Sequence, residues 1–276
     1  MSPSSIPRMP VAFISHGAGP WPLLDVAFPR DEGSSLLSHL RDVARMSATA
    51  PTALVVISAH WEERVPMVMS SPNPPILYDY GGFGPEAYAI TWPAPGNPVL
   101  AARARDLLAG AGFTTAEDTK RGYDHGTFVS MKVAFPDAQI PVVQLSLIEG
   151  LDASEHLKMG QALAPLRDEG VLVIGTGNTF HNLQVVRAAM QGAAQGAREQ
   201  AAAFDDWLQA AVTADPSARD ERLRSWDKAP FARFAQPRED HLIPLMVAAG
   251  AAGADRGVTM WSGTLAGLRG SSFRFG

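Results

Sequence analysis

Val11–Pro20, VAFISHGAGP, is the stretch from which the fold can be deduced. Val11–Ser15 is a short apolar run rich in β-forming residues and ends at a glycine-rich turn, so it predicts a buried strand. His16 lies where the strand passes into the turn, which is where α/β sheets usually hold their ligands. The pattern recurs at Leu54–Ser58, LVVIS, which runs on to His60. Two strands that end on histidines can direct both imidazoles to one point, and this predicts a metal site.

Helical and strand patterns alternate along the rest of the chain. Helices are expected at Ser35–Ser47, Asn97–Gly112, a short stretch from Thr127, Ser154–Arg167, Ala193–Ala214 and a last segment through Ala252; strands are expected at Pro141–Leu147 and Val171–Ile174, with edge strands at Val258–Trp261 and Ser271–Gly276. Such alternation is typical of an α/β fold with a mostly parallel or mixed central sheet and helices on both faces. No shift in composition marks a boundary, so we expect a single domain over residues 1–276.

Composition excludes several classes of protein. With 276 residues, of which 46% are hydrophobic and 18% charged, the chain can bury a sizeable core. A net charge of −5 argues against nucleic-acid and anionic-membrane partners. There is no apolar stretch long enough to span a bilayer and no secretory signal in MSPSSIPRMP, so a cytoplasmic location is expected. The chain has no cysteine, so any metal must take nitrogen and oxygen ligands. Homo-oligomerisation stays open.

The segment Pro66–Pro98 has a different composition from the rest. It holds eight prolines in 33 positions, together with Tyr78, Tyr80, Phe83, Tyr88 and Trp92. Long loops inside compact domains are often functional, so this segment is a candidate wall for a substrate. A surface excursion that packs its aromatic rings inward fits the composition equally well.

The placement of the histidines is more informative than their number. Five of the seven follow a strand or a glycine-rich turn, or open a helix: His16, His60, His125, His181 and His241. His39 and His156 lie within helical patterns among polar neighbours, and we expect both at the surface. Each histidine alone fits a hydrogen-bonded structural role. Five in such settings, on a chain without cysteine, favour a metal site, although no compact motif such as H-E-x-x-H is present.

Other catalytic motifs are incomplete. Gly17–Pro20 and Gly175–Gly177 are fragments of a dinucleotide-binding fingerprint, but neither completes G-x-G-x-x-G. No G-x-S-x-G elbow is present, so a serine hydrolase of the α/β type lacks its nucleophile. A histidine phosphatase would need an arginine beside His16, and Ser15 occupies that place.

Eight stretches together resemble one family. They are ISHGAGP, ISAHW, LYDYGGF from Leu77, WPAPG from Trp92, DHGTFVSM, GTGNTFHNL, DHLIPL and the closing SSFRFG. In this order they resemble the DOPA-dioxygenase-type branch of the class III, LigB-like, extradiol ring-cleaving dioxygenases. The resemblance runs from Ile14 to Gly276. It implies a single α/β domain that uses a mononuclear non-haem iron(II) to insert O2 into a catechol-type substrate, DOPA-like or related; zinc is sometimes found in such proteins.

The resemblance also implies roles for the five histidines. It assigns metal ligation to His16, His60 and His241. It puts His125 and His181 beside the substrate as acid–base or binding groups, and leaves open whether His181 also approaches the metal.

One departure from the wider family concerns the third ligand. The LigB-like group generally uses two histidines and a glutamate, whereas the third position here carries His241, preceded by Glu239 and Asp240. Either acid could restore a carboxylate to the metal if its side chain faced the ion. Neighbouring acids are more often a feature of a helix N-terminus, where the dipole favours them.

The reaction needs an open metal face and a base, because a catechol gives up protons as it binds a metal. Since imidazole ordinarily titrates near neutral pH, His125 is the candidate for moving that proton. Tyr123, Tyr78 and Tyr80 are candidates for stacking on the ring. Two alternatives stay open: a zinc hydrolase that activates water at the same ligands, with His125 or Glu239 as base, and a non-catalytic binding protein of this fold.

Overall fold

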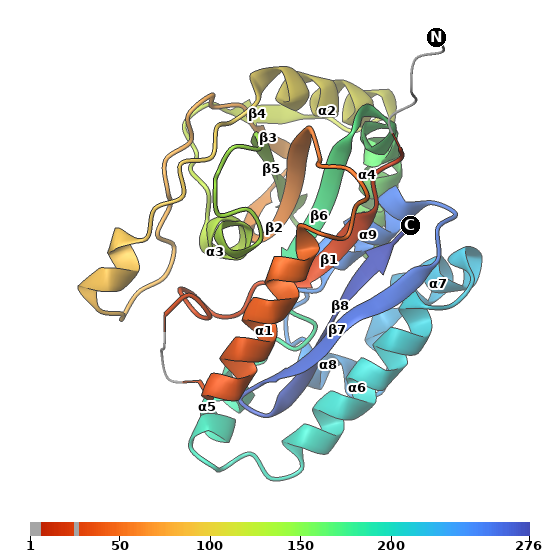
Figure 1. The fold of residues 1–276 in the computed structure, drawn as a ribbon. Helices are drawn as coiled ribbons and strands as arrows, with labels where there is room; N and C mark the ends of the chain where they lie inside the picture. The colour runs from red at the N-terminus through yellow and green to blue at the C-terminus, as the bar shows by residue number, and fades with distance from the viewer. Residues whose placement is uncertain (1–6, 25–27) are drawn as a thin grey trace.

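The computed structural model describes residues 7–24 and 28–276; the N-terminal residues 1–6, part of the stretch without a signal, lie outside the described residues. Its strands form one sheet in the order β4-β3-β5-β2-β6-β1-β8-β7 (Figure 1). The strands are β1 (Val11–Ser15), β2 (Ala53–Glu63), β3 (Met67–Met69), β4 (Ala116–Asp118), β5 (Val142–Ile148), β6 (Val171–Gly177), β7 (Gly257–Leu265) and β8 (Leu268–Phe275).

The helices are α1 (Arg30–Val43), α2 (Pro98–Gly110), α3 (His125–Ala134), α4 (Ala153–Leu163), α5 (Leu183–Met190), α6 (Ala197–Val212), α7 (Pro216–Arg224), α8 (Ala232–Ala235) and α9 (Ile243–Ala252). Three 3-10 segments are η1 (Pro85–Ala89), η2 (Ala164–Glu169) and η3 (Trp226–Lys228). The α/β class and the mixed sheet are therefore confirmed.

The centre of the sheet is parallel and its flanks are mixed. Strands β5, β2, β6 and β1 pair in parallel, whereas β8 joins β1 antiparallel and β7 joins β8 antiparallel. The last two strands form a hairpin through Ala266 and Gly267, both at positive φ, which is the conformation that a tight two-residue turn requires. Both C-terminal strands had been expected at an edge. Only β7 lies there, because the hairpin inserts β8 between β7 and β1.

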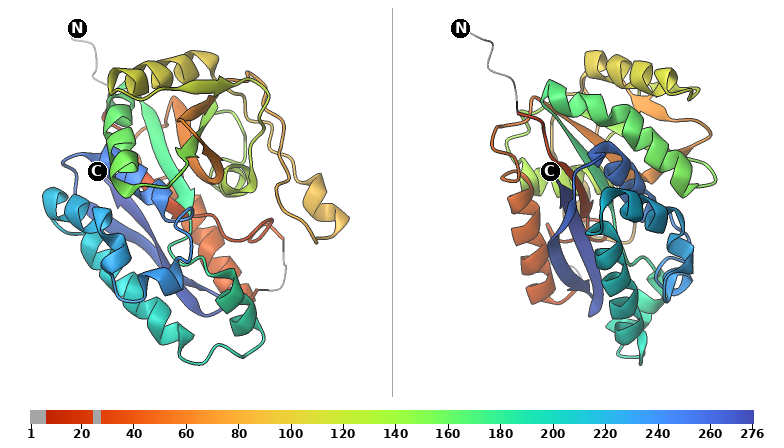
Figure 2. Two further views of the ribbon diagram at one scale, coloured as in Figure 1. Left: turned by 180° about the vertical axis from the view of Figure 1, so that it is seen from behind. Right: turned by 90° about the vertical axis from the view of Figure 1, so that its right-hand side faces the viewer.

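Alternate residues of each central strand pack on opposite faces, as the two-residue period of a strand requires. Val11 and Phe13 belong to a core formed with α4, α6 and α9, whereas Ala12 and Ile14 belong to a second core formed with α1 and α3. The edge-on view shows helices on both sides of the sheet (Figure 2). A sheet buried on both faces explains why these strands read as continuous apolar runs.

Within the described ranges, no helix is long and apolar enough to cross a membrane.

Candidate metal centre

His16 is held by the turn that follows β1. Its backbone N–H donates to the carbonyl of Gly177, 3.1 Å away, so the chain continues the parallel pairing with β6 for one residue beyond the strand. The chain then reverses at Gly17, whose φ is +85°; a Cβ at this position would lie 2.5 Å from the carbonyl oxygen of Trp21. The glycine-rich turn thus leaves the His16 side chain buried at the carboxyl end of the sheet.

His60 is directed to the same place by an irregularity in β2. Four residues of β2 lie between Ile57 and Glu62, whereas only one residue of β5 lies between their partners, Leu145 and Leu147. Such bulges bend a strand and redirect side chains, and they are common next to active sites. The guanidinium of Arg121 donates to the carbonyl of His60 at 3.1 Å and stabilises the irregular segment.

His241 comes from the other end of the chain, in the turn before α9. Its carbonyl oxygen accepts the backbone N–H of Asn178 at 3.1 Å. A Cβ at Gly177 would lie 2.0 Å from that oxygen, so only glycine permits this approach. The G-x-G fragment at the end of β6 therefore serves close packing of the His241 segment and not the binding of a dinucleotide.

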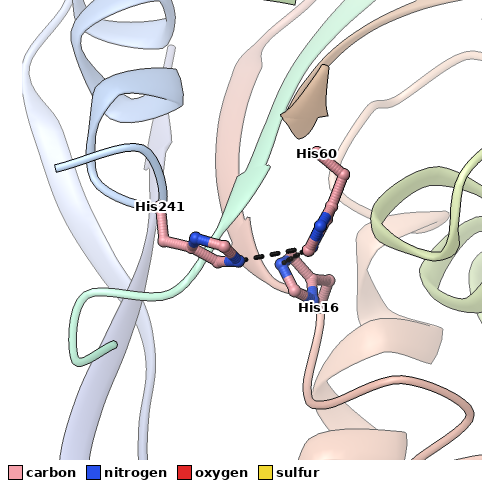
Figure 3. Close-up of side chains that lie close together, drawn as sticks. All are labelled: His16, His60 and His241. Carbon is pink, nitrogen blue, oxygen red and sulfur yellow. Dashed lines mark hydrogen bonds between the residues drawn. The ribbon is translucent and has the colours of Figure 1, made fainter. Parts of the chain in front are cut away.

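The three imidazoles converge although they lie far apart in sequence. Nε2 of His60 is 3.2 Å from Nε2 of His16 and 3.2 Å from Nε2 of His241 (Figure 3). Nitrogens that share one ion at about 2.1 Å are separated by about 3 Å, so the spacing fits a common metal. The donor set also fits, because imidazole nitrogen suits zinc and iron alike. His16, His60 and His241 thus form a group that could hold a metal.

Burial keeps the three imidazoles neutral. Desolvation lowers the pKa of His16 and of His241 well below the usual value, with neighbouring histidines adding to the effect. Desolvation, followed by the nearby His125, lowers the pKa of His60 to about 3. A metal ligand must offer a lone pair, so all three are in the required form at neutral pH without the help of a metal.

These shifts predict how stability depends on pH. Burial also lowers the pKa of His39, His156 and His181 to about 4, whereas an unfolded histidine titrates near 6.5. Below pH 6.5 the unfolded chain therefore binds protons that the folded chain excludes. Each such histidine lowers the free energy of unfolding by up to about 1.4 kcal/mol for each pH unit. We expect the Tm of the metal-free protein to fall steeply as the pH is lowered from about 7.5 to about 5.

Thermal unfolding monitored by circular dichroism measures this dependence. His156→Gln removes one of the groups, and its Tm should fall less steeply with pH. A Tm that stays constant over this pH range would contradict the burial argument.

His125 opens α3 and lies against the three-histidine group. Asp124 caps the helix by accepting the N–H of Thr127, and its buried carboxylate also accepts from Ser58 and Gln144. Both the backbone N–H and Nδ1 of His125 lie 2.9 Å from Oδ1 of Asp79. Burial alone would raise the pKa of Asp79, but its interactions with His125 and His60 outweigh burial and lower it. Asp79 is therefore an ionised carboxylate beside the metal group.

His181 stacks on His241, with ring centroids 3.3 Å apart and planes at 16°. It is not a member of the three-nitrogen group; its Nδ1 faces Oδ1 of Asp240 at 3.8 Å. The same Asp240 oxygen lies 3.2 Å from Nδ1 of His241, on the side of the ring away from the shared nitrogens. Glu239 pairs with Arg233. Neither acid thus faces the position that a metal would occupy.

A cavity of about 210 Å³ adjoins the histidines. Its wall consists of His16, Gly17, Ala18, Gly19, Phe28, His60, His125, Asn178, Phe180, His181, Leu183, Val186, His241 and Leu265. All five histidines singled out in the sequence therefore meet at one cavity whose remaining wall is largely apolar. A larger hollow, about 430 Å³, lies on the surface between α5 and α6, and the residues that line it include no histidine.

The three tyrosines named as ring-stacking candidates are not part of this wall. Tyr123 is fully buried, its hydroxyl lies among backbone carbonyls, and burial raises its pKa. Tyr78 and Tyr80 donate to the carbonyls of Ile90 and Ala87 within their own loop. Tyr80 does reach the site indirectly, because its ring lies 5.7 Å from that of His125.

The prediction that His39 and His156 lie at the surface is wrong. His156 is fully buried; its Nε2 accepts the N–H of Ile148 and its Nδ1 lies 2.7 Å from the carbonyl of Asp152. His39 is 4% exposed and stacks on Trp261. Both are structural histidines in helices: His39 packs on a residue distant in sequence, and His156 is hydrogen-bonded to residues just before its own helix.

Two functional candidates were not recognised in the sequence. Asn178 lines the cavity, donates to the carbonyl of Gly17 and accepts from the hydroxyl of Ser15, so it joins the first turn to the end of β6. Asp79 contacts His125 from the proline-rich loop. Asp79 lies within the LYDYGGF stretch. An acidic residue between two tyrosines was the feature of the sequence from which its role could have been suspected.

Comparisons with known proteins agree with this geometry. Residues 11–272 match the family described as the catalytic LigB subunit of aromatic ring-opening dioxygenase. The chain is 42% identical to a 4,5-DOPA dioxygenase extradiol of Beta vulgaris, over 87% of this chain and 86% of that protein. It is 33% identical to the protein of the same name from Escherichia coli, over 88% and 85%. The crystal structure of an uncharacterized protein, JW3007, from Escherichia coli K12 superposes with a TM-score of 0.78 at 29% identity, covering 98% of this chain and all of that one.

Proposed function

Because this chain belongs to the LigB family of aromatic ring-opening dioxygenases, we propose that it opens the ring of a catechol, DOPA or a related compound, with iron(II) held by His16, His60 and His241. The family makes the protein a metal-dependent extradiol dioxygenase, an oxidoreductase. The substrate, the metal and the residue roles are the proposal. The observation that carries them is the convergence of three neutral imidazoles, with Nε2 of His60 3.2 Å from Nε2 of both His16 and His241, at the edge of an apolar cavity.

The cavity wall suits an aromatic diol. Phe28, Phe180 and Leu265 offer apolar surface to the ring, while the histidines occupy the side where the two oxygens would lie. His125 would accept a proton from the diol and return it later in the reaction. His181 would bind the substrate from the opposite side, stacked on His241.

The ligand set affects which metal supports the reaction. Three neutral imidazoles add no charge, so a divalent ion would keep its full charge for the ionised diol, whereas a carboxylate ligand would reduce it. When bound, iron(II) would supply the one-electron chemistry through which O2 attacks the ring. Zinc competes well for nitrogen ligands but has no redox chemistry. We therefore propose that zinc can be present in the isolated protein and that iron(II) is the active metal.

Metal exchange tests the proposal. The metal is removed without oxygen, the protein is loaded separately with iron(II) or zinc, and oxygen uptake is followed with a panel of catechols. We expect uptake and a yellow ring-opened product with iron(II) alone. Equal uptake by the zinc form would overturn the metal assignment, and uptake by neither form would favour the zinc hydrolase or the binding protein.

Three further statements are proposals of the same kind. We propose that residues 1–276 form one catalytic domain and that the protein acts in the cytoplasm. With a net charge of −5, we expect no nucleic-acid or membrane partner. Size-exclusion chromatography with light scattering would decide between a monomer and a homo-oligomer.

A further inference from the structure

We propose that Asp79 is a positioning residue, which holds His125 in the tautomer and orientation that acid–base work on the diol requires. This inference rests on the proposed function and adds a residue to it. It also gives a role to the LYDYGGF stretch, whose tyrosines do not line the cavity.

The contact between Asp79 and His125 has two hydrogen bonds to one oxygen. Oδ1 of Asp79 accepts the backbone N–H of His125 at 2.9 Å, and Nδ1 of the imidazole lies 2.9 Å from the same oxygen. The backbone group can only donate, so it keeps Oδ1 in the accepting role. The other oxygen, Oδ2, lies 3.5 Å from Nδ1 of His60.

The chemistry of a carboxylate determines which nitrogen of His125 carries the proton. An ionised carboxylate only accepts, so the Nδ1 that faces it must carry a proton. In the neutral imidazole, Nε2 then carries the lone pair. Because His125 lines the cavity and Nδ1 is engaged by Asp79, Nε2 is the nitrogen left for a substrate hydroxyl. The contact with Asp79 therefore leaves Nε2 of His125 as the nitrogen that can accept a proton.

The loop around Asp79 is fixed from both sides. Tyr78 and Tyr80 each donate a 2.7 Å hydrogen bond, to Ile90 and Ala87 respectively, and so tie the loop to the segment that carries η1. The N–H of Leu77 donates to the carbonyl of Tyr123, two residues before His125. The loop projects from the body of the molecule (Figure 1), and the two hydrogen bonds to His125 hold Asp79 at the site. A carboxylate on so constrained a backbone can fix the orientation of its partner.

The tautomer can be measured without activity. The metal-free protein, labelled with ¹⁵N-histidine, is studied by long-range ¹H–¹⁵N NMR at about pH 8, where imidazole is ordinarily neutral. Comparison with His125→Phe identifies the His125 signals. We expect the Nδ1–H tautomer in the wild type and in Asp79→Asn, whose amide oxygen can replace Oδ1, and a mixture of tautomers in Asp79→Ala. An Nε2–H tautomer in the wild type would overturn the proposal, whatever the variants do.

Kinetics of the iron-loaded protein form the second test. Asp79→Ala should lower kcat by about 10- to 100-fold, the usual effect of losing a partner that orients a functional histidine. Its metal content and KM should change little, and Asp79→Asn should regain most of kcat. Glu86→Gln, which removes an exposed carboxylate from the same loop, is the matched control and should behave as wild type.

A double variant separates positioning from a general loss of stability. If Asp79 acts through His125, adding Asp79→Ala to His125→Phe should slow the reaction no further, whereas independent effects would multiply. Multiplying effects, an unchanged kcat in Asp79→Ala, or loss of metal in parallel with activity would each overturn the proposal. If the wild type cleaves no catechol, the proposed function fails, and the NMR experiment still decides the role of Asp79.

Discussion

Replacing His241 by alanine is expected to give a folded protein that retains little metal and takes up no oxygen with a catechol. The Nε2 atoms of His16, His60 and His241 converge on one point, and the neighbouring Asp240 lies on the far side of the His241 ring from that point. Loss of a partner that merely orients a ligand costs about 10- to 100-fold in metal affinity, so loss of the ligand itself should cost more. His16→Ala and His60→Ala should behave alike.

Elemental analysis of the folded variants measures this effect. His39→Gln, which changes a buried histidine outside the site, should keep full metal content. His241→Glu should also retain metal, since a carboxylate can ligate iron or zinc in place of an imidazole. Full metal occupancy in any one of the three alanine variants would remove that residue from the ligand set.

His125→Phe is expected to lower kcat by about 100- to 10,000-fold, the usual contribution of a general acid–base group. The phenyl ring occupies similar space but cannot move a proton. Since His125 contributes no nitrogen to the group of His16, His60 and His241, metal content should remain that of the wild type.

Steady-state oxygen uptake, normalised to bound iron, gives kcat directly. Turnover equal to wild type would exclude His125 from proton transfer. A parallel loss of iron and activity would instead make His125 a metal ligand.

The features that could be predicted from the sequence are those set by local pattern. Apolar runs such as Val11–Ser15 and Leu54–Ser58 lie in central parallel strands. A strand buried on both faces is a continuous apolar run without polar alternation, so it is easily recognised in the sequence. A histidine at the end of each run was then necessarily near the carboxyl edge of the sheet. The meeting of His16 and His60 also depends on the bulge in β2, which the local pattern does not reveal.

Other features depend on contacts that local pattern does not encode. His156 looked exposed because its neighbours in the helix are polar, but the N–H of Ile148 needs an acceptor and the imidazole provides it. Tyr123 is next to Asp124 and His125 in sequence, yet its ring points into the core. Asp79 is 46 residues from His125, and the return of its loop to the site depends on tertiary packing.

The wide spacing of the metal group affects when the ion can bind. His16 and His60 are 44 residues apart, and His60 and His241 are 181 apart, so no two ligands are near enough in sequence to chelate an ion before the chain has folded. During synthesis the site stays incomplete until nearly all of the polypeptide has emerged. If these histidines hold the metal as proposed, the ion would bind late in maturation, and its binding would stabilise the native state alone. On that proposal, the chain would fold around an empty site, and the ion would enter a group of ligands that is already assembled.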